Sequence, residues 1–372
     1  MAELEQYTWE PPLAIPGTDT VQAFDYIIYV DAGTYVSSAG WGRTDMGSSA
    51  SFSTLYNACY NELSARGGRI LLFGGAYFVD ATLTCDENNV ITKGSGWDTI
   101  LTLANGVNSH MFYVTASGTE IHDLRMVGNN ANNAATSHGI YVYRSSSHRF
   151  VNLKIYDFEN DDIHIGEDTW QPCLGGKITR CYLGDTTNKT TGNGVYVDYS
   201  ATDWEIWANV MAEHEGAGMA GMVMDGSNNN TWSNHFWGNY YHVVVAPANH
   251  VNGWISHGDK YMDGKRHAIY KPTGYWWKNS AITSAQFWWN GQDAADTYDS
   301  IYTVGDVRCI EVQANFRGET DAGVHITRFI WNADADVDHC RVTGIVEGYN
   351  EVAPVVFIGA GCDQDLIIFD CS

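Results

Sequence analysis

Gly139-Ile140-Tyr141-Val142-Tyr143 is the first clear copy of a strand pattern that returns along the chain at intervals of about 20 to 33 residues, within the range of solenoid repeats. The later copies are Asp162-Ile163-His164-Ile165-Gly166, Gly194-Val195-Tyr196-Val197-Asp198, Gly221-Met222-Val223-Met224-Asp225, His242-Val243-Val244-Val245-Ala246, His267-Ala268-Ile269-Tyr270-Lys271 and Ser300-Ile301-Tyr302-Thr303-Val304. In each copy the period-two alternation of a strand places the second and fourth side chains inside and the other three outside.

A second type of strand recurs between these copies. Its members include Ile121-His122-Asp123-Leu124, Phe150-Val151-Asn152-Leu153, Ile178-Thr179-Arg180-Cys181, Ile206-Trp207-Ala208-Asn209, Trp232-Ser233-Asn234-His235 and Trp254-Ile255-Ser256-His257. Two-residue hairpin turns are scarce, so the two strand families do not fit a sandwich of simple hairpins. They fit coils stacked in parallel register, in which each coil covers the apolar interior of the one before it. We therefore predict an all-β parallel β-helix.

The open end of such a solenoid needs a cap, because an exposed coil is an edge prone to aggregation. Residues 51–66 carry an amphipathic helical pattern, and Gly67-Gly68 ends it in the manner of a C-terminal cap. We predict an N-terminal arm with its first strand over 1–50, then the capping helix and first coil over 51–105. Residues 106–372 then form the β-helix, with roughly ten coils at the solenoid period and a C-terminal cap.

The order of elements near the N-terminus resembles the start of pectate-lyase-like proteins, a superfamily of polysaccharide lyases, polygalacturonases and phage tailspike depolymerases. The helix and Gly67-Gly68 are followed by the apolar strand Arg69–Phe73, a Gly-x-Tyr segment at Gly75–Tyr77, the segment Asn89–Gly96 and Thr99-Ile100-Leu101. The resemblance is clear over residues 30–105, and the later coils are compatible with it. It implies a right-handed parallel β-helix that acts on polysaccharide.

The charge balance excludes several classes of partner. The chain has 20 Lys+Arg against 44 Asp+Glu, a formal net charge of -24, which repels nucleic acid and anionic membranes. No apolar stretch is long enough to insert into a membrane, and Met1–Pro16 is acidic and lacks the features of a secretory signal. We expect an extracellular or virion-surface protein, whose leader has been removed or which leaves its cell in a virus particle.

The 8 cysteines show no CxxC pair, so we predict no metal-binding cysteine site and interpret most of them as small buried residues. A disulfide between Cys173 and Cys181, or between Cys362 and Cys371, stays open. We predict no cofactor, with calcium as the one compatible ion.

The first pair of candidate catalytic residues is Asp198 and Asp225. Both occupy the fifth, outward position of successive copies, so stacking places them about 4.8 Å apart. Two carboxylates that close do not both ionise easily, so one acquires a raised pKa and can act as an acid. Lys271 is expected in the same column two coils further on. The alternative is a solvated or calcium-binding pair at the strand ends.

The second candidate group is Asp161, Asp162 and His164. Asp162 and His164 are expected to point outward, with Tyr141 and Tyr196 in the column of His164 on the neighbouring coils. The segment is similar to the Asp-Asp strand of polygalacturonases, which implies acid and base roles for Asp161 and Asp162. Two other polygalacturonase signatures are absent, and an Asp-Asp pair at a strand start is also ordinary turn chemistry.

Cations and aromatic rings supply candidate substrate contacts. Lys265 and Arg266 lie in the most cationic segment of the chain, residues 257–267, and form the alternative site together with Lys271, because a lyase needs Lys or Arg as its base. The rings of Tyr141, Tyr143, Trp170 and Tyr196 are expected on the same face as the carboxylates, where flat rings stack on sugars. Outward aromatic residues can equally form a trimer interface.

Three further polar segments are interpreted as structural. Glu213-His214-Glu215 reads as a solvated loop, and His235 and His257 are placed in the column of Asn209, where stacked polar side chains hydrogen-bond between coils.

These observations favour a protein that binds polysaccharide and hydrolyses it through Asp162, Asp198 and Asp225, with His164 and the tyrosines positioning the sugar. The alternatives are a glycan-binding spike without activity, a structural virion or surface component, and a lyase that uses Lys or Arg. Fold alone does not decide between them. The analogy with tailspikes adds the expectation of a homotrimer.

Overall fold

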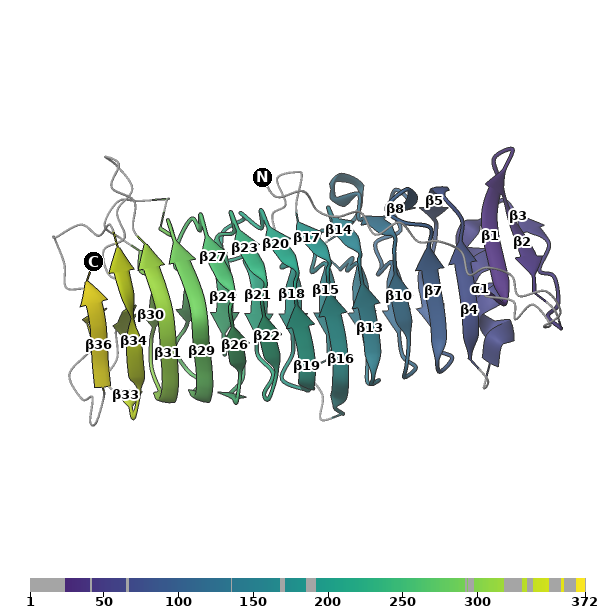
Figure 1. Cartoon of the computed structure of the whole chain (residues 1–372). Helices are drawn as coiled ribbons and strands as arrows, with labels where there is room; N and C mark the ends of the chain where they lie inside the picture. The colour runs from purple at the N-terminus through teal and green to yellow at the C-terminus, as the bar shows by residue number, and fades with distance from the viewer. Residues whose placement is uncertain are drawn as a thin grey trace, which may run out of the picture.

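The recurrent strands stack in parallel register along one solenoid, as their alternation predicts (Figure 1). The computed structural model describes residues 24–40, 42–64, 67–134, 136–167, 171–184, 192–291, 293, 298–317, 330–332, 337–347, 356–357 and 366–371. Trp170 and the predicted arm before residue 24 lie outside the described residues.

An 11-stranded sheet contains the first strand family. Its strands are β6 (Leu83–Cys85), β9 (Phe112–Val114), β12 (Ile140–Val142), β15 (Ile163–Ile165), β18 (Val195–Val197), β21 (Ala220–Met224), β24 (Tyr241–Val245), β28 (Ile269–Lys271), β30 (Ile301–Thr303), β32 (Ile330–Asn332) and β35 (Val356–Phe357). The register pairs Ile140 with Ile163 and Ile163 with Val195. These side chains are fully buried, whereas Tyr141 and His164, the next residues along their strands, are partly exposed. This confirms the predicted alternation.

A 25-stranded sheet contains two strands of most coils. One row is β4 (Gly68–Leu72), β7 (Val90–Gly94), β10 (Glu120–His122), β13 (His148–Val151), β16 (Cys173–Thr179), β19 (Ala201–Trp207), β22 (Asn230–Trp232) and β26 (Ile255–His257). The other row is β5 (Gly75–Val79), β8 (Thr99–Leu103), β11 (Arg125–Val127), β14 (Lys154–Tyr156), β17 (Tyr182–Gly184), β20 (Val210–Ala212), β23 (His235–Trp237) and β27 (Lys260–Met262).

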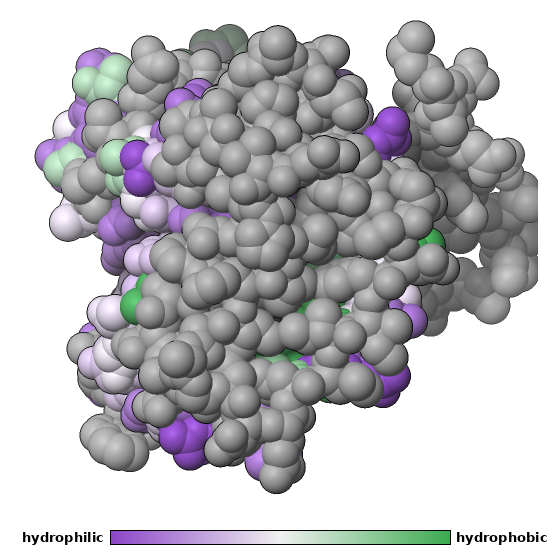
Figure 2. All heavy atoms as spheres, turned by 90° about the vertical axis from the view of Figure 1, so that its left-hand side faces the viewer, coloured by the Kyte–Doolittle hydropathy of each residue, from purple (hydrophilic) through white to green (hydrophobic). Residues whose placement is uncertain are grey.

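Towards the C-terminus the two rows merge into long strands. These are β29 (Trp277–Trp288), β31 (Val307–Arg317), β34 (Arg341–Glu347) and β36 (Leu366–Cys371), with the short β25 (Val251–Asn252) and β33 (Val337–Asp338) beside them. One 3-10 turn, η2 (Asn130–Asn132), lies between β11 and β12. Viewed from the end nearest β36, the described residues that show at the rim are largely hydrophilic (Figure 2).

The helix α1 (Phe52–Leu63) packs against the first coil, in agreement with the predicted capping helix (Figure 1). Ser51 caps its N-terminus by accepting a hydrogen bond from the backbone N–H of Thr54. Phe52 contacts the rings of Tyr35 and Tyr77, with ring centroids 5.5 Å and 4.8 Å away. Before the helix, β1 (Tyr26–Asp31), β2 (Thr34–Ala39) and β3 (Ser48–Ser49) pair antiparallel, and β1 continues the stack by pairing parallel with β4.

A buried polar ladder runs through one corner of the coils. The amide oxygen of Asn209 accepts from the backbone N–H of Cys181, and its Nδ2 donates to the carbonyl of Ile178. On the next two coils the Oδ1 atoms of Asn234 and Asp259 accept from the backbone N–H groups of Asn209 and Asn234 in the same way. The prediction that His235 and His257 occupy this column was wrong by one and two positions, because the ladder uses residues whose side chains reach a backbone N–H one coil away.

The cysteines bear out their interpretation in part. Cys59, Cys85, Cys173 and Cys181 are buried and free, so Cys173 and Cys181 form no disulfide, whereas Cys309 is exposed. Cys362 lies outside the described residues. Within the described residues no helix has the length and apolarity needed to cross a membrane.

Candidate functional site

Two columns of side chains run along the outward face of the 11-stranded sheet. The central column joins Tyr113, Tyr141, His164 and Tyr196 through the parallel register. The ring of His164 stacks between those of Tyr141 and Tyr196, with a centroid distance of 4.9 Å to each. The predicted column of Tyr141, His164 and Tyr196 is therefore confirmed.

The second column lies three residues earlier in each coil, at His110, His138, Asp161 and Asn193. Sequence reasoning selected only Asp161 from it. The other members follow from the same register, because the position before Gly139 is aligned with the position before Asp162. Extending the repeat by one residue towards the N-terminus would have found His138 and Asn193.

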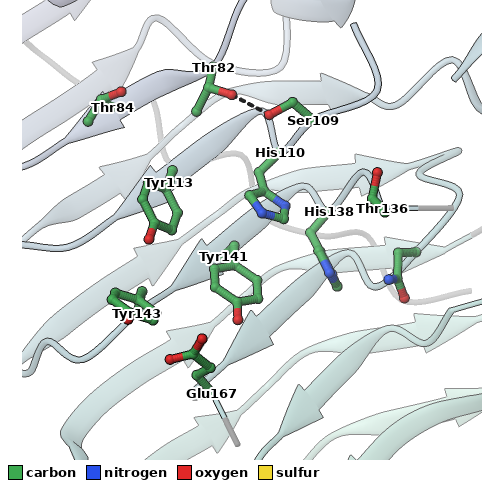
Figure 3. Close-up of a pocket in the computed structure, with 11 residues that line it drawn as sticks. Thr82, Thr84, Ser109, His110, Tyr113, Thr136, His138, Tyr141, Tyr143 and Glu167 are labelled. Atoms are coloured by element: carbon green, nitrogen blue, oxygen red, sulfur yellow. Dashed lines mark hydrogen bonds between the residues drawn. The ribbon is translucent and has the colours of Figure 1, made fainter. Parts of the chain in front are cut away.

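The two columns line a groove (Figure 3). Two adjoining cavities of about 710 Å³ and 500 Å³ share His138, Tyr141, Asn160 and Glu167, so they form one continuous depression. The remaining lining residues are Thr82, Thr84, Ser109, His110, Tyr113, Thr136, Tyr143, Asp161, His164, Gly192, Asn193, Tyr196 and Asp198. The groove therefore presents rings, imidazoles and carboxyl groups together.

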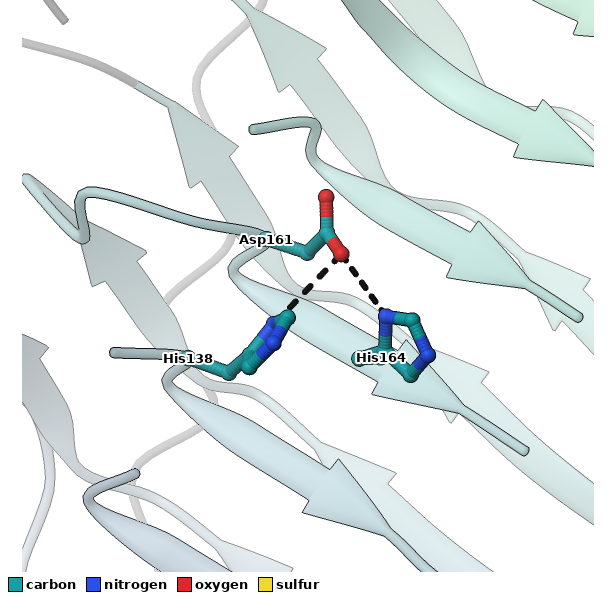
Figure 4. Close-up of side chains that lie close together, drawn as sticks. All are labelled: His138, Asp161 and His164. Carbon is teal, nitrogen blue, oxygen red and sulfur yellow. Dashed lines mark hydrogen bonds and ion pairs between the residues drawn. The ribbon is translucent and has the colours of Figure 1, made fainter. Parts of the chain in front are cut away.

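Asp161 is held between two histidines (Figure 4). Its Oδ1 accepts hydrogen bonds of 2.8 Å from both the backbone N–H and the Nδ2 of Asn193. Its Oδ2 lies 2.8 Å from the Nδ1 of His164 and 3.4 Å from the Nδ1 of His138. Burial alone would raise the pKa of Asp161, but the two histidines bring it far below its ordinary value. Asp161 is thus a carboxylate that fixes the tautomer of His164.

The same three residues could hold a metal ion. One donor atom from each of His138, Asp161 and His164 lies within 4.8 Å of the other two. Two imidazole nitrogens and one carboxylate suit zinc or another transition metal, whereas calcium prefers oxygen ligands. The alternative to a metal site is a hydrogen-bonded pair, because His164 contacts Asp161 directly.

Comparison with known proteins gives matches in structure only. No protein-family model matches the sequence, and no curated protein matches it. The A-modules of two mannuronan C-5 epimerases from Azotobacter vinelandii align with TM-scores of 0.59 and 0.61 at 14% and 15% identity, covering 87% and 86% of this chain and 95% and 91% of theirs.

Tailspike protein 2 from Escherichia coli O157:H7 bacteriophage CAB120 aligns at a TM-score of 0.62 and 14% identity, covering 86% of this chain and 45% of that one. DFA-IIIase from Arthrobacter chlorophenolicus A6 aligns at 0.58 and 11%, covering 86% and 90%. This chain has the parallel β-helix fold that these structures share. At these identities the likeness concerns the fold, so the site must be argued from its own residues.

Asp162 does not face the groove. Its carboxylate is fully buried and lies 3.2 Å from the Nε2 of His214, which is also fully buried. The expectation that Asp162 points outward was wrong, and so was the interpretation of His214 as part of a solvated loop. The physical reason is Gly194 between them, which lacks a side chain and leaves room for the imidazole: a Cβ there would lie 3.0 Å from the His214 ring.

Asp198 and Asp225 lie on successive coils at the far edge of the columns, but in different environments. Asp198 lines the groove, and burial raises its pKa, with hydrogen bonds from Ser200 and the nearby His164 opposing the rise. Asp225 is fully buried and accepts hydrogen bonds from the backbone N–H groups of Ala248 and Asn249 and from the Asn249 side chain. These contacts favour a structural role for Asp225.

The predicted cationic residues do not enter the groove. Lys271 pairs in register with Thr303, points into the coil and donates to the carbonyls of Pro272 and Val304 at 2.9 Å and 2.8 Å. The prediction that it points outward in the column of Asp225, two coils further on, was wrong, because Ile269 rather than Ala268 takes the inward position of its strand. Lys265 pairs with Glu215 at 2.6 Å, and Arg266 lies 3.6 Å from Asp293.

Tyr143 lies where it was expected, at the edge of the groove. The guanidinium of Arg144 covers its ring at 4.6 Å and pairs with Glu167 at 3.3 Å. Glu167 was not singled out from the sequence, since it follows the strand copy in a segment without periodic pattern.

Proposed function

We propose that this protein binds a polysaccharide along the outward face of the 11-stranded sheet and hydrolyses it there. The observation that carries the proposal is the ring column of Tyr141, His164 and Tyr196 beside a buried Asp161 that orients His164. Flat rings suit sugar faces, and an imidazole fixed by a carboxylate is a general base. The mannuronan epimerases and tailspikes that share the fold support a glycan substrate.

The proposed reaction uses His164 in the central column and Asp198 at the edge of that column. His164 shares the proton on Nδ1 with Asp161, so its Nε2 accepts a proton from water. Asp198, whose pKa burial raises, donates a proton to the glycosidic oxygen. The bond from the anomeric carbon to that oxygen breaks, the bond from the carbon to the water oxygen forms, and the water proton passes to His164. The sugar rings rest against Tyr141 and Tyr196.

The carboxylates that act in this proposed reaction differ from those expected from the sequence. Asp198 and Asp161 keep roles in the reaction, whereas Asp162 and Asp225 support the backbone around them. Elimination through Lys or Arg is disfavoured, because Lys271 is buried and Lys265 and Arg266 are paired with carboxylates.

A panel of purified polysaccharides tests the proposal. Hydrolysis produces new reducing ends without ultraviolet absorbance, and His164→Ala should remove this activity while the protein stays folded. Absorbance from an unsaturated uronate would show that the reaction is elimination and not hydrolysis. Binding without any product would show that the protein is a glycan-binding spike without this activity.

We further propose that the protein works outside the cell or on a virion surface as a homotrimer, as the tailspike likeness suggests. Light scattering of the purified chain measures its mass, and a monomer over the full concentration range would contradict the trimer.

A further inference from the structure

The two columns of the groove reappear further along the same sheet. Beyond Tyr196 the central column continues through Val223, Val244, Tyr270 and Tyr302. The second column continues beyond Asn193 through Ala220, Tyr241, His267 and Asp299, as the same pairings show. Four rungs of about 4.8 Å separate His164 from Tyr270, or roughly 19 Å.

The later part of the columns forms a second ring platform, which consists of Tyr241, His267, Tyr270 and Tyr302. Tyr241 and Tyr270 stack at 4.9 Å, and His267 and Tyr302 at 4.4 Å. The three tyrosines are half-buried, so part of each ring faces solvent. The second platform differs from the first platform (Tyr141, His164 and Tyr196) in the place of its histidine. The central column carries tyrosines at 270 and 302, while the imidazole of His267 lies in the second column, where its Nδ1 contacts the backbone of Asp299.

The two platforms are connected by small apolar residues. Ala220, Val223 and Val244 pack into one outward cluster, and the rings of Tyr196, Tyr241 and Tyr270 pack against it. Tyr196 belongs to the first platform and the other two rings to the second. The strip from Tyr113 to Tyr302 is thus continuous over seven rung steps, about 34 Å.

Three cations among the described residues near the strip each lie beside a carboxylate. Arg144 pairs with Glu167 at the first platform, while Arg266 lies 3.6 Å from Asp293 and stacks over Tyr240 at the second. Lys265 is paired with Glu215. Together with the net charge of -24, this arrangement does not favour a polyanion.

We infer that Tyr241, His267, Tyr270 and Tyr302 form a second, non-catalytic sugar-binding platform, and that the substrate is a long polysaccharide of low charge that spans both platforms. The inference rests on the proposed function for the first platform. It adds that binding strength depends on chain length, because a short oligosaccharide reaches only one set of rings.

Affinity electrophoresis through gels containing neutral polymers (dextran, galactomannan or glucomannan) or polygalacturonate tests this inference. At least one neutral polymer should retard the protein more strongly than polygalacturonate. The double variant Tyr270→Ala/Tyr302→Ala should raise the Kd for that polymer about tenfold and leave the Kd for its trisaccharide unchanged. Tyr270→Phe/Tyr302→Phe keeps the rings and should keep the affinity.

The matched control is Trp207→Ala/Trp232→Ala, a stacked outward pair on the 25-stranded sheet with ring centroids 5.8 Å apart. It should leave polymer binding unchanged. Retardation by polygalacturonate alone, retardation by no polymer, or an alanine double variant with unchanged polymer affinity would each overturn the second platform. Binding that depends on chain length without any cleavage would instead support the second platform and contradict the proposed hydrolysis.

Discussion

The imidazole of His214 lies 3.2 Å from the carboxylate of Asp162, although 52 residues separate them and neither is exposed to solvent. The ring also contacts Asn239 on the opposite side, so it connects three coils directly behind the groove. Because Asp162 is the neighbour of Asp161, this contact holds the backbone that presents the orienting carboxylate.

His214→Ala should therefore lower the free energy of unfolding by about 3 kcal/mol, since it leaves a buried carboxylate without its partner. Denaturant unfolding measures the change. His257→Ala is the control, because His257 is exposed and contacts only the hydroxyl of Thr283 among the described side chains; its effect should stay within about 0.5 kcal/mol. Equal effects of the two substitutions would show that the buried contact adds no more to the free energy of unfolding than an exposed histidine does.

The sequence predicted the outward column well but not this interior contact. Tyr141, His164 and Tyr196 could be aligned because each stands between two large apolar residues, which identify the inward positions of its strand. In the strand of Lys271 both Ala268 and Ile269 can face inward, so the alignment slipped by one residue. The approach of His214 to Asp162 depends on the space above Gly194 and on a turn that enters from a coil two steps away. Periodicity carries no information on either.

Asp198→Asn should reduce kcat by about 100-fold or more, because the amide cannot donate a proton to the leaving oxygen. In the parent protein, activity should fall as pH rises through the pKa of Asp198, and this pKa lies above the ordinary aspartate value because of burial. A pH–rate profile measures both effects. Asp225→Asn should instead lower Tm with activity retained, since Asp225 accepts backbone hydrogen bonds. Full activity in Asp198→Asn would remove it from the mechanism.

Asp161→Asn should lower kcat by about 100-fold with little change in KM, because the amide no longer fixes the tautomer of His164. Steady-state kinetics on the hydrolysed polysaccharide separate the two constants. Asn193→Ala, which removes one of the two hydrogen bonds to Asp161 Oδ1, should give a smaller decrease. A change confined to KM would place Asp161 in substrate binding only.

Chelation should leave activity unchanged, because the proposed base is an imidazole and no step uses a metal. Excess Zn²⁺ should inhibit, since it would take the Nδ1 atoms of His138 and His164 and displace the proton shared with Asp161. Assays with EDTA and with added zinc measure this, and His138→Ala should weaken the inhibition. Loss of activity with EDTA that zinc restores would instead make the metal a part of the catalytic site.

The polar ladder in the corner of the coils contains one group that should make stability depend on pH. Asp259 is buried, and burial raises its pKa to about 6 despite hydrogen bonds from Asn234, Thr231 and Ser256. The unfolded chain has an ordinary aspartate pKa near 4, so between about pH 4 and pH 6 the folded protein binds more protons. Stability from this group is therefore present at low pH and decreases as pH rises through 6.

Asp259→Asn should remove that dependence and raise Tm at pH 8. On the preceding coils Asn209 and Asn234 already occupy equivalent positions, and their Nδ2 groups donate to the carbonyls of Ile178 and Ile206. An asparagine at 259 can take the same role without burying a charge, a gain of up to about 3 kcal/mol at pH 8. Thermal melts of both proteins from pH 5 to 8 measure the difference. Parallel Tm curves would mean that Asp259 stays ionised in the folded protein, with its four hydrogen bonds outweighing burial.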